Sequence, residues 1–255
     1  MQGRFAGKVA LVTGGTQGMG QAIAVRLASE GALVGVNRRP DLSAEETLAM
    51  VKAVGGEAFD VAADMRDPKQ IKEMIATVAK RGSRLDYVVS NAAINPFMTW
   101  DDTSIEDFDN LFETNVRGAW VVCTEGARQM VAEGHGGAIV MISSISAHVG
   151  APTQVAYCGT KGAISMLGKA LGSVLGKNGI RVNVIEPGAI DTPMAAGLFE
   201  QPDVLKYYLD RIPLGRVGKP SEIAATVAFL LSDDASYVTS AALLVDAGFI
   251  VNAEL

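Results

Sequence analysis

The chain has 255 residues, of which 49% are hydrophobic and 20% are charged, and its formal net charge is −6. It is long enough to bury a substantial core, whereas the acidic balance and the lack of a basic or aromatic stripe argue against a nucleic-acid partner. No apolar stretch has the length of a membrane span, and the N-terminus lacks the apolar region of a signal peptide, so we expect a cytoplasmic protein without a membrane partner.

The first elements are a strand, a glycine turn and a helix. The apolar run 9–13, which is rich in β-branched residues, is followed by a turn rich in glycine and then by the helical pattern 22–28. Glycine permits a tight turn and a close backbone approach, and the new helix offers unpaired N–H groups to a pyrophosphate. The spacing Gly-x-x-x-Gly-x-Gly departs from the better known Gly-x-Gly-x-x-Gly. The turn predicts a dinucleotide site containing Gly14, Thr16, Gln17, Gly18, Met19 and Gly20.

A second strand, 32–36, is followed closely by Arg38 and Arg39. At this place in a dinucleotide site an acidic residue accepts a hydrogen bond from the ribose 2′-hydroxyl, whereas arginine suits a 2′-phosphate. The first acidic residue is Asp41, beyond a proline. We therefore predict NADP(H) rather than NAD(H) as the cofactor. Use of both cofactors would also fit, and so would two arginines that are only solvated loop charges.

Strand and helix patterns alternate along the rest of the chain. They predict an α/β fold, a single doubly wound Rossmann-type domain over 1–255 with about seven parallel strands and helices on both faces. The segment 192–213 carries aromatic residues among polar ones, which suits either a mobile substrate lid or a packed helical insertion. The later strands are expected at 86–90, 138–142, 181–185 and 242–245, and the later helices at 105–130, 155–175 and 221–232.

One motif carries candidate chemistry: Ser144 follows an apolar strand, and Tyr157 stands four residues before Lys161. On a helix this spacing places the phenol and the ammonium on one face. A nearby ammonium stabilises the phenolate and lowers the phenol pKa from its usual value of roughly 10, which makes a usable general acid or base. Ser144 could hold the same substrate oxygen in line. The alternative is a surface Tyr-x-x-x-Lys pair that arose by chance.

Metal and disulfide chemistry find no support in the sequence. Cys123 and Cys158 are too few for a disulfide framework and are not spaced as metal ligands. His135 and His148 form no cluster, so we predict no metal site. His148 could line a pocket because it follows Ser144 closely, but an exposed loop position is the expectation.

From about residue 7 to residue 248 the chain resembles the short-chain dehydrogenase/reductase family. The resemblance rests on the glycine turn, on Ser90-Asn91-Ala92-Ala93, on the Ser–Tyr–Lys motif and on Pro187-Gly188-Ala189-Ile190-Asp191-Thr192. It implies a catalytic tetrad of Asn115, Ser144, Tyr157 and Lys161, and a homotetramer. It also adds cofactor contacts at Asp64, Met65, Asn91, Pro187, Gly188, Ile190 and Thr192, together with Tyr157 and Lys161. Ser90, Ala93 and the Asp246-Ala247-Gly248 segment depart from the usual motifs without removing a group that the mechanism needs.

The family mechanism implies hydride transfer between a substrate carbon and nicotinamide C4, with Tyr157 moving the hydroxyl proton. Lys161 would lower the phenol pKa and bind the nicotinamide ribose, Ser144 would orient the substrate oxygen, and Asn115 would hold a water that leads protons out. The cofactor performs the difficult chemistry, while the protein supplies alignment and electrostatics.

Several segments, among them Val36-Asn37-Arg38 and Ile212-Pro213-Leu214-Gly215, resemble the aldose 1-dehydrogenase branch of the family. The chain lacks the glutamate that glucose dehydrogenases carry between the positions of Ile94 and Asn95, and it is most similar to the L-rhamnose 1-dehydrogenases, which form a lactone. The expected substrate is a small molecule, a sugar. Its hydroxyls need several polar partners, and the candidates are Ser144, Ser146, Gln154, Tyr157 and Asn95.

Two other functions stay open. A 3-oxoacyl carrier-protein reductase has the same tetrad and would show a basic patch near Arg128, but Glu125 and Glu133 dilute it here. A non-catalytic dinucleotide-sensing regulator is the second alternative, and the intact tetrad argues against it.

Overall fold

The computed structural model describes residues 3–252, so the two ends of the predicted 1–255 domain, 1–2 and 253–255, lie outside the described residues. Within them, seven parallel strands form one sheet in the order β3-β2-β1-β4-β5-β6-β7. The strands are β1 (Val9–Val12), β2 (Leu33–Arg38), β3 (Glu57–Ala62), β4 (Tyr87–Ser90), β5 (Gly137–Ile142), β6 (Ile180–Pro187) and β7 (Ala242–Val245). This confirms the predicted doubly wound α/β fold.

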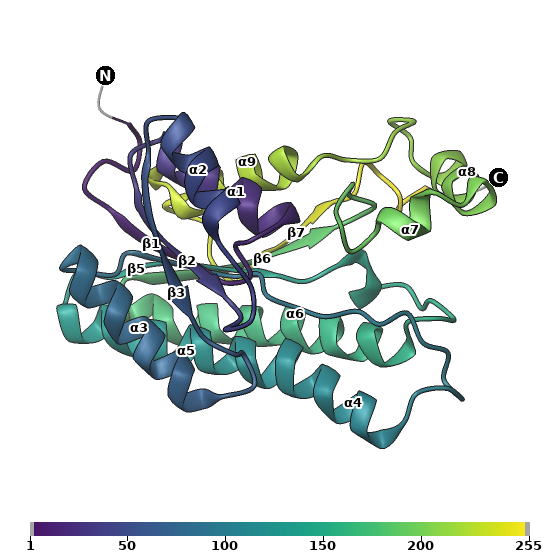
Figure 1. Cartoon of the computed structure of the whole chain (residues 1–255), viewed down its shortest axis with the longest axis horizontal. Coiled ribbons are helices and arrows are strands. Elements are labelled where there is room, and N and C mark those ends of the chain that lie inside the picture. Colours follow the sequence, from purple (N-terminus) through teal and green to yellow (C-terminus); the bar gives the residue numbers. More distant parts are fainter. Residues whose placement is uncertain (1–2, 253–255) are drawn as a thin grey trace.

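Helices cover both faces of the sheet (Figure 1). One layer contains α1 (Gly18–Ser29), α2 (Glu45–Ala53) and α9 (Pro220–Leu231), and the opposite layer contains α3 (Pro68–Gly82), α5 (Ala119–Glu133) and α6 (Val155–Leu175). Along β1, Ala10 and Val12 join the apolar cluster under α1 and α9, while Val9 and Leu11 join the cluster under α3 and α5. This alternation follows from the two-residue period of a strand, and burial on both faces explains why β1 is apolar throughout.

Three further helices extend one end of the molecule. α4 (Ile105–Phe112) continues the layer of α6, while α7 (Ala196–Phe199) and α8 (Pro202–Arg211) project beyond the sheet beside the C-terminal segment (Figure 1). α4 begins with a capping box, in which the Ser104 hydroxyl accepts from the Asp107 N–H and the Asp107 carboxylate accepts from the Ser104 N–H. No helix within the part of the chain described by the structure is long and apolar enough to cross a membrane.

Two parts of the fold differ most from the sequence expectation. The predicted helix 105–130 is not one α-helix, because a π-helical turn, Glu113–Gly118, separates α4 from α5, which runs on to Glu133. No range was predicted for β3, where Glu57 and Asp60 interrupt the apolar pattern and only Val61 is buried. An edge strand of this kind lacks the continuous apolar run of a central strand.

The order of the strands in the sheet determines where a ligand site can lie. The chain runs outward from β1 to β2 and β3, then returns to the other side of β1 with β4. Connections therefore diverge on either side of the gap between the carboxyl ends of β1 and β4, where doubly wound sheets bind ligands. Gly14 follows β1 closely and Asn91 directly follows β4, so both predicted cofactor residues lie at this point.

Candidate active site

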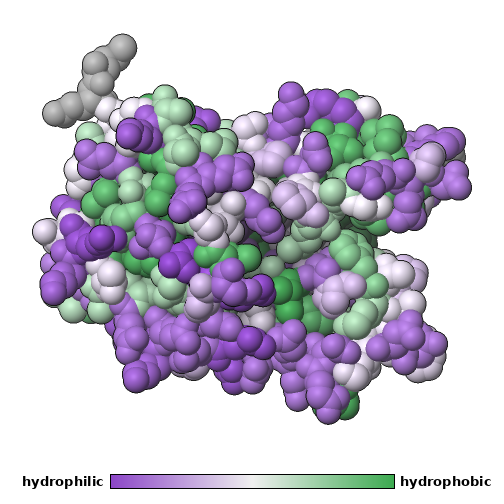
Figure 2. Space-filling view, in the orientation of Figure 1, coloured by the Kyte–Doolittle hydropathy of each residue, from purple (hydrophilic) through white to green (hydrophobic). Residues whose placement is uncertain are grey.

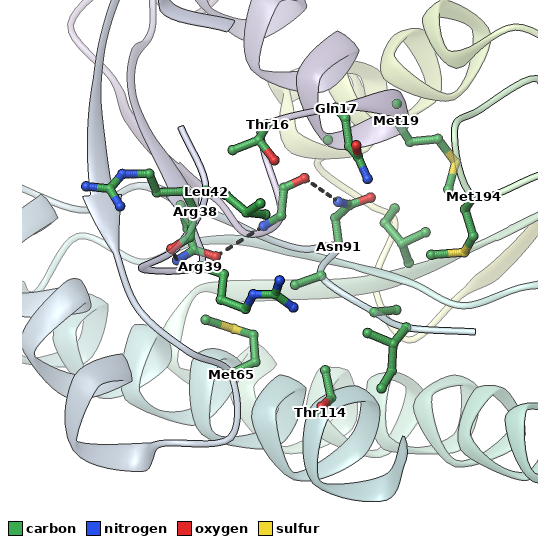
Figure 3. Close-up of a pocket in the computed structure, with 18 of the residues that line it drawn as sticks. Thr16, Gln17, Met19, Arg38, Arg39, Leu42, Met65, Asn91, Thr114 and Met194 are labelled. Carbon is green, nitrogen blue, oxygen red and sulfur yellow. Dashed lines mark hydrogen bonds between the residues drawn. The ribbon is translucent and has the colours of Figure 1, made fainter. Parts of the chain in front are cut away.

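A cavity of about 520 Å³ opens at the carboxyl ends of β1, β2 and β4. In Figure 3, Arg38 and Arg39 lie at one end of it, Met19 and Met194 lie at the other, and Asn91 is between them. Most of the predicted cofactor residues line this cavity. They are Gly14, Thr16, Gln17, Gly18, Met19, Gly20, Arg38, Arg39, Asp64, Met65, Asn91, Tyr157, Lys161 and Thr192.

The glycine turn can be built only with glycine at certain positions. Gly14 and Gly18 have φ of +61° and +54°, which side chains rarely adopt. A Cβ on Gly20 would lie 2.1 Å from the Gly14 carbonyl oxygen, so α1 crosses the turn at backbone contact. Among the described residues, no side chain caps the first turn of α1, which leaves its N–H groups available beside the cavity. This suits a pyrophosphate.

Two asparagines fasten the turn to the sheet. The Gly14 N–H donates to Asn37 Oδ1 at 3.1 Å, and Asn91 Nδ2 donates to the carbonyls of Thr13 and Gly14 at 2.9 and 3.2 Å, as the dashed lines of Figure 3 partly show. Asn37 is buried, and its amide also bonds carbonyls of β3 and the following loop. Asn37 was not among the predicted site residues. The sequence feature that could have identified Asn37 is a polar residue at the end of an apolar strand.

The cavity end near the arginines is rich in charge. Arg38 Nε bonds Asp60 Oδ2 at 2.8 Å, and Arg39 pairs with Asp41. Arg66 donates to both carboxylate oxygens of Asp64 and lowers the pKa of that carboxyl, so this predicted cofactor contact is already engaged by a neighbour. Arg66 also lines the cavity and had not been predicted as a site residue.

Tyr157 and Lys161 lie on one face of α6, as their spacing predicts. Lys161 is buried, its Nζ donates to the Ile142 carbonyl at 3.0 Å, and within residues 3–252 no carboxylate forms an ion pair with it. The same Nζ is 5.4 Å from the centroid of the Tyr157 ring. A buried ammonium that borders the cavity with only one protein acceptor in the described chain would suit a ribose diol.

The pKa values of this pair are shifted mainly by burial. Burial raises the pKa of the Tyr157 phenol well above its usual value, while a hydrogen bond with Ser144 acts in the opposite direction. Burial lowers the pKa of Lys161 to about 8. The expectation of a lowered phenol pKa is therefore corrected: burial outweighs any effect of the ammonium on the phenol pKa, and the ammonium donates to a backbone carbonyl.

Asn115 occupies the π-helical turn between α4 and α5 and borders neither of the two cavities described here. Its Oδ1 accepts from the Ile94 N–H at 2.8 Å, and its Nδ2 donates to the Ile94 carbonyl at 2.9 Å and to Thr160 Oγ1 at 3.2 Å. Thr160 in turn donates to the Tyr157 carbonyl. Asn115 thus ties the loop after β4 to the helix of the candidate phenol, and π-helical turns of this kind frequently mark functional sites.

Replacing Asn115 with alanine should lower the free energy of unfolding by about 2–4 kcal/mol, because the Ile94 N–H and carbonyl lose their partners. Urea denaturation measures the change. The exposed Asn178 is a matched control, for which the same substitution should cost less than about 0.5 kcal/mol. Equal effects at the two positions would contradict the role of Asn115.

A buried polar cluster lies behind Ser144. Glu186, at the end of β6, accepts from Ser165 Oγ at 2.6 Å and from His148 Nε2 at 2.8 Å. Ser165 Oγ lies 2.9 Å from Ser143 Oγ, which donates to the Lys161 carbonyl. The cluster joins β5, α6 and β6. His148 is exposed as expected, but its bond to Glu186 was not predicted, although a glutamate at the end of an apolar strand was a visible signal.

A second cavity of about 120 Å³ adjoins the first and shares Tyr157, Thr192 and Met194 with it. Pro187, Gly188 and Ile190 lie here rather than in the first cavity. All five candidate sugar contacts line it: Asn95, Ser144, Ser146, Gln154 and Tyr157. Ser144 Oγ and Ser146 Oγ lie 3.2 Å apart. The cavity therefore brings a row of polar side chains to the phenol.

The other wall of the second cavity is apolar. It is formed by Leu198, Phe199 and Tyr208 of the α7–α8 segment, with Phe97 from the loop after β4. Phe199 and Tyr208 pack edge to face at 5.5 Å between ring centroids, and Tyr208 also packs against Phe249. Figure 2 shows the surface hollowed between the projecting α7–α8 lobe and the layer below it. The predicted segment 192–213 thus contains two helices that cover this cavity.

The residues present fit a nicotinamide dinucleotide. The uncapped start of α1 suits its pyrophosphate, Lys161 suits a ribose, and the arginines suit a phosphate on the other ribose. No group of three or more histidine, cysteine or acidic side chains that could hold a metal ion occurs in the described range 3–252. Fold and site together define a dinucleotide-dependent oxidoreductase.

Comparisons with known proteins agree with this class. Residues 14–250 match the family model described as enoyl-(acyl carrier protein) reductase. The chain is 40% identical over 247 residues to L-rhamnose 1-dehydrogenase (NAD(P)(+)) of Sphingomonas sp. strain SKA58, covering 96% of this chain and 97% of that one. It is 36% identical to cyclopentanol dehydrogenase of Comamonas sp. strain NCIMB 9872, covering 98% of this chain and 100% of that one.

A solved structure is similar over the same range. The short-chain type dehydrogenase/reductase from Mycobacterium marinum superposes with a TM-score of 0.91 at 32% identity, covering 96% of each chain. The chain belongs to the short-chain dehydrogenase/reductase family. The two dehydrogenases named above are oxidoreductases that act on CH–OH groups.

Proposed function

We propose that the chain is an aldose 1-dehydrogenase that oxidises the C1 hydroxyl of L-rhamnose to a lactone, with NADP+ as preferred cofactor and NAD+ accepted. The observation that carries the proposal is the row of Asn95, Ser146 and Gln154 beside Ser144 and Tyr157 in the second cavity. A sugar offers several hydroxyls that must be matched when they leave water. The 40% identity to an L-rhamnose 1-dehydrogenase supports the choice of sugar.

In the proposed mechanism Tyr157 accepts the proton of the C1 hydroxyl, and Ser144 holds that oxygen in line with the phenol. The bound nicotinamide supplies the hydride acceptor. The phenol must lose a proton that burial makes it retain, so a charged Lys161 ammonium and the Ser144 hydroxyl would stabilise the phenolate. Asn115 would act by holding the Ile94 loop and Thr160, and a water relay at Asn115 stays a prediction.

The cofactor would lie along the first cavity. Gly14, Thr16, Gln17, Gly18, Met19 and Gly20 would hold its pyrophosphate, Asp64, Met65 and Asn91 its adenosine half, and Pro187, Gly188, Ile190 and Thr192 its nicotinamide end. The apolar wall of Leu198 and Phe199 would then cover the sugar, with 192–213 acting as a lid that excludes water.

Two alternative functions have less support. A carrier-protein reductase would need an exposed basic patch, but Arg128 pairs with Glu125, which also lies 3.6 Å from Lys72. A dinucleotide sensor would not need Ser144 and Lys161 on either side of Tyr157, where the two cavities meet. A homotetramer, formed through helices 105–130 and 155–175 and the C-terminal segment, and a cytoplasmic location stay predictions.

The test is a screen of aldoses with NADP+ and NAD+, following the absorbance of the reduced nicotinamide. L-rhamnose should give a kcat/KM at least about tenfold above that of D-glucose, since mismatched hydroxyls lose hydrogen bonds in the transition state. L-mannose, which differs from L-rhamnose by a C6 hydroxyl, should be poorer because that group would face the apolar wall. Oxidation of cyclopentanol alone, or reduction of acetoacetyl thioesters alone, would refute the sugar assignment.

A further inference from the structure

The two arginines at the end of β2 are held in different ways. Arg38 is the last residue of β2 and pairs with Ala62 in the β2–β3 ladder. Its guanidinium bonds Asp60 of β3 at 2.8 Å and the Pro40 carbonyl at 3.1 Å, and its side chain is 25% exposed. Arg38 is therefore anchored in the sheet by both its backbone and its side chain.

Arg39 lies just beyond the strand and is held by a neighbour. Its Nη2 donates to Asp41 Oδ2 at 2.7 Å, its Nε donates to the other carboxylate oxygen, and the two side chains are 54% and 61% exposed. Exposed ion pairs are weak because water and salt screen them. Arg39 can consequently exchange this carboxylate for another anion without breaking any contact within the sheet.

Both arginines border the first cavity at the end farthest from Met194 (Figure 3). We propose that Arg39 is the ligand of a cofactor 2′-phosphate and that Asp41 is a built-in competitor for it, which reduces the preference for NADP(H) and keeps NAD(H) usable. This inference rests on the dinucleotide use included in the proposed function. Arg38 stays bound to Asp60, so it supplies positive charge at the site but does not exchange partners.

The physical argument concerns two effects of one carboxylate. To bind a 2′-phosphate bidentately, Arg39 must give up its fork-like contact with Asp41. The carboxylate also repels the phosphate dianion at short range. NAD(H) carries a 2′-hydroxyl at this place and meets neither penalty. Asp41 thus weakens the binding of NADP(H) and leaves the binding of NAD(H) unaffected.

Calorimetric titration with NADP+ and with NAD+, in the absence of sugar, tests the proposal independently of the substrate. Asp41→Asn keeps the shape of the side chain and removes its charge. It should tighten NADP+ binding by about three- to tenfold at low salt, with a smaller gain at high salt, and leave the Kd for NAD+ within about twofold. Arg39→Gln should weaken NADP+ binding by more than about tenfold.

Two further variants make the test specific. In the Arg39→Gln background, Asp41→Asn should bring no tightening, because the two changes act on one contact. The comparison variant Asp60→Asn releases Arg38 instead and should tighten NADP+ binding less than Asp41→Asn does, because Asp60 pairs with Arg38 and not with Arg39. The proposed competition would be overturned if Asp41→Asn changed the Kd for NADP+ and NAD+ equally. It would also be overturned if Asp41→Asn still tightened NADP+ binding in the Arg39→Gln background. Binding of neither nucleotide would overturn the proposed function as well, whereas normal nucleotide discrimination without sugar oxidation would overturn the sugar assignment alone.

Discussion

Replacing Tyr157 with phenylalanine should lower kcat for sugar oxidation by about a thousandfold or more, while the Kd for NADP+ stays within about twofold. The substitution removes the only atom of the side chain that can accept the hydroxyl proton, and general acid–base catalysis typically contributes about 10²–10⁴ in rate. The ring, which packs near Lys161, is retained. Stopped-flow or steady-state assays and calorimetry measure the two quantities.

The wild-type pH profile adds a second readout. Because burial raises the pKa of the phenol, its base form is scarce at neutral pH, and oxidation should accelerate as the pH rises. The increase should flatten above about pH 8, where Lys161 loses the proton that makes it a phenolate-stabilising cation. Tyr237, whose side chain is fully exposed, is the matched control for phenylalanine substitution and should leave kcat unchanged. Turnover within tenfold of the wild type in the Tyr157 variant would remove the phenol from the mechanism.

Gly20→Ala should abolish measurable dinucleotide binding and destabilise the fold by about 1–3 kcal/mol, as expected for overpacking. An alanine is normally the better helix residue by about 1 kcal/mol. Here its Cβ would lie 2.1 Å from the Gly14 carbonyl oxygen and 2.6 Å from Asn91 Nδ2, so the turn and the end of β4 must separate. That movement disrupts the start of α1, where the pyrophosphate would bind.

The control for this prediction is Gly176, at the end of α6. Its backbone is helical, and an added Cβ would have open space around it. Gly176→Ala should leave nucleotide binding unchanged and should not lower stability. Calorimetry and urea denaturation on both variants separate loss of the site from loss of the fold. Normal NADP+ affinity in the Gly20 variant would show that the turn is not the pyrophosphate site.

Much of the fold and of the candidate site follows from local patterns. The spacing of Tyr157 and Lys161 needs only a helix to bring the two groups to one face, and α6 has the predicted bounds. The strand, glycine turn and helix at the start of the chain are contiguous in sequence, so their geometry depends little on distant residues. These features could be predicted because short-range sterics and hydrophobic period decide them.

The remaining features depend on contacts between distant segments. The π-helical turn at Asn115 has no composition signal, since it depends on a match with Ile94 and Thr160 across the fold. The direction of the Tyr157 pKa shift was missed because the amount of burial is a tertiary property. Asn37 was missed for the same reason, because its partners lie in the glycine turn, β3 and the following loop.

The buried carboxylate at the end of β6 constrains how such a chain can evolve. Glu186 accepts hydrogen bonds from Ser165 and His148, which belong to two other segments. Ser165 also bonds Ser143, the residue next to the candidate catalytic Ser144. Losing one member leaves a buried acceptor or hydroxyl without its partner, which costs more than losing the whole set. Divergent descendants should therefore exchange these positions jointly, and a lineage with an apolar residue in place of the glutamate should also have lost the polar groups that face it.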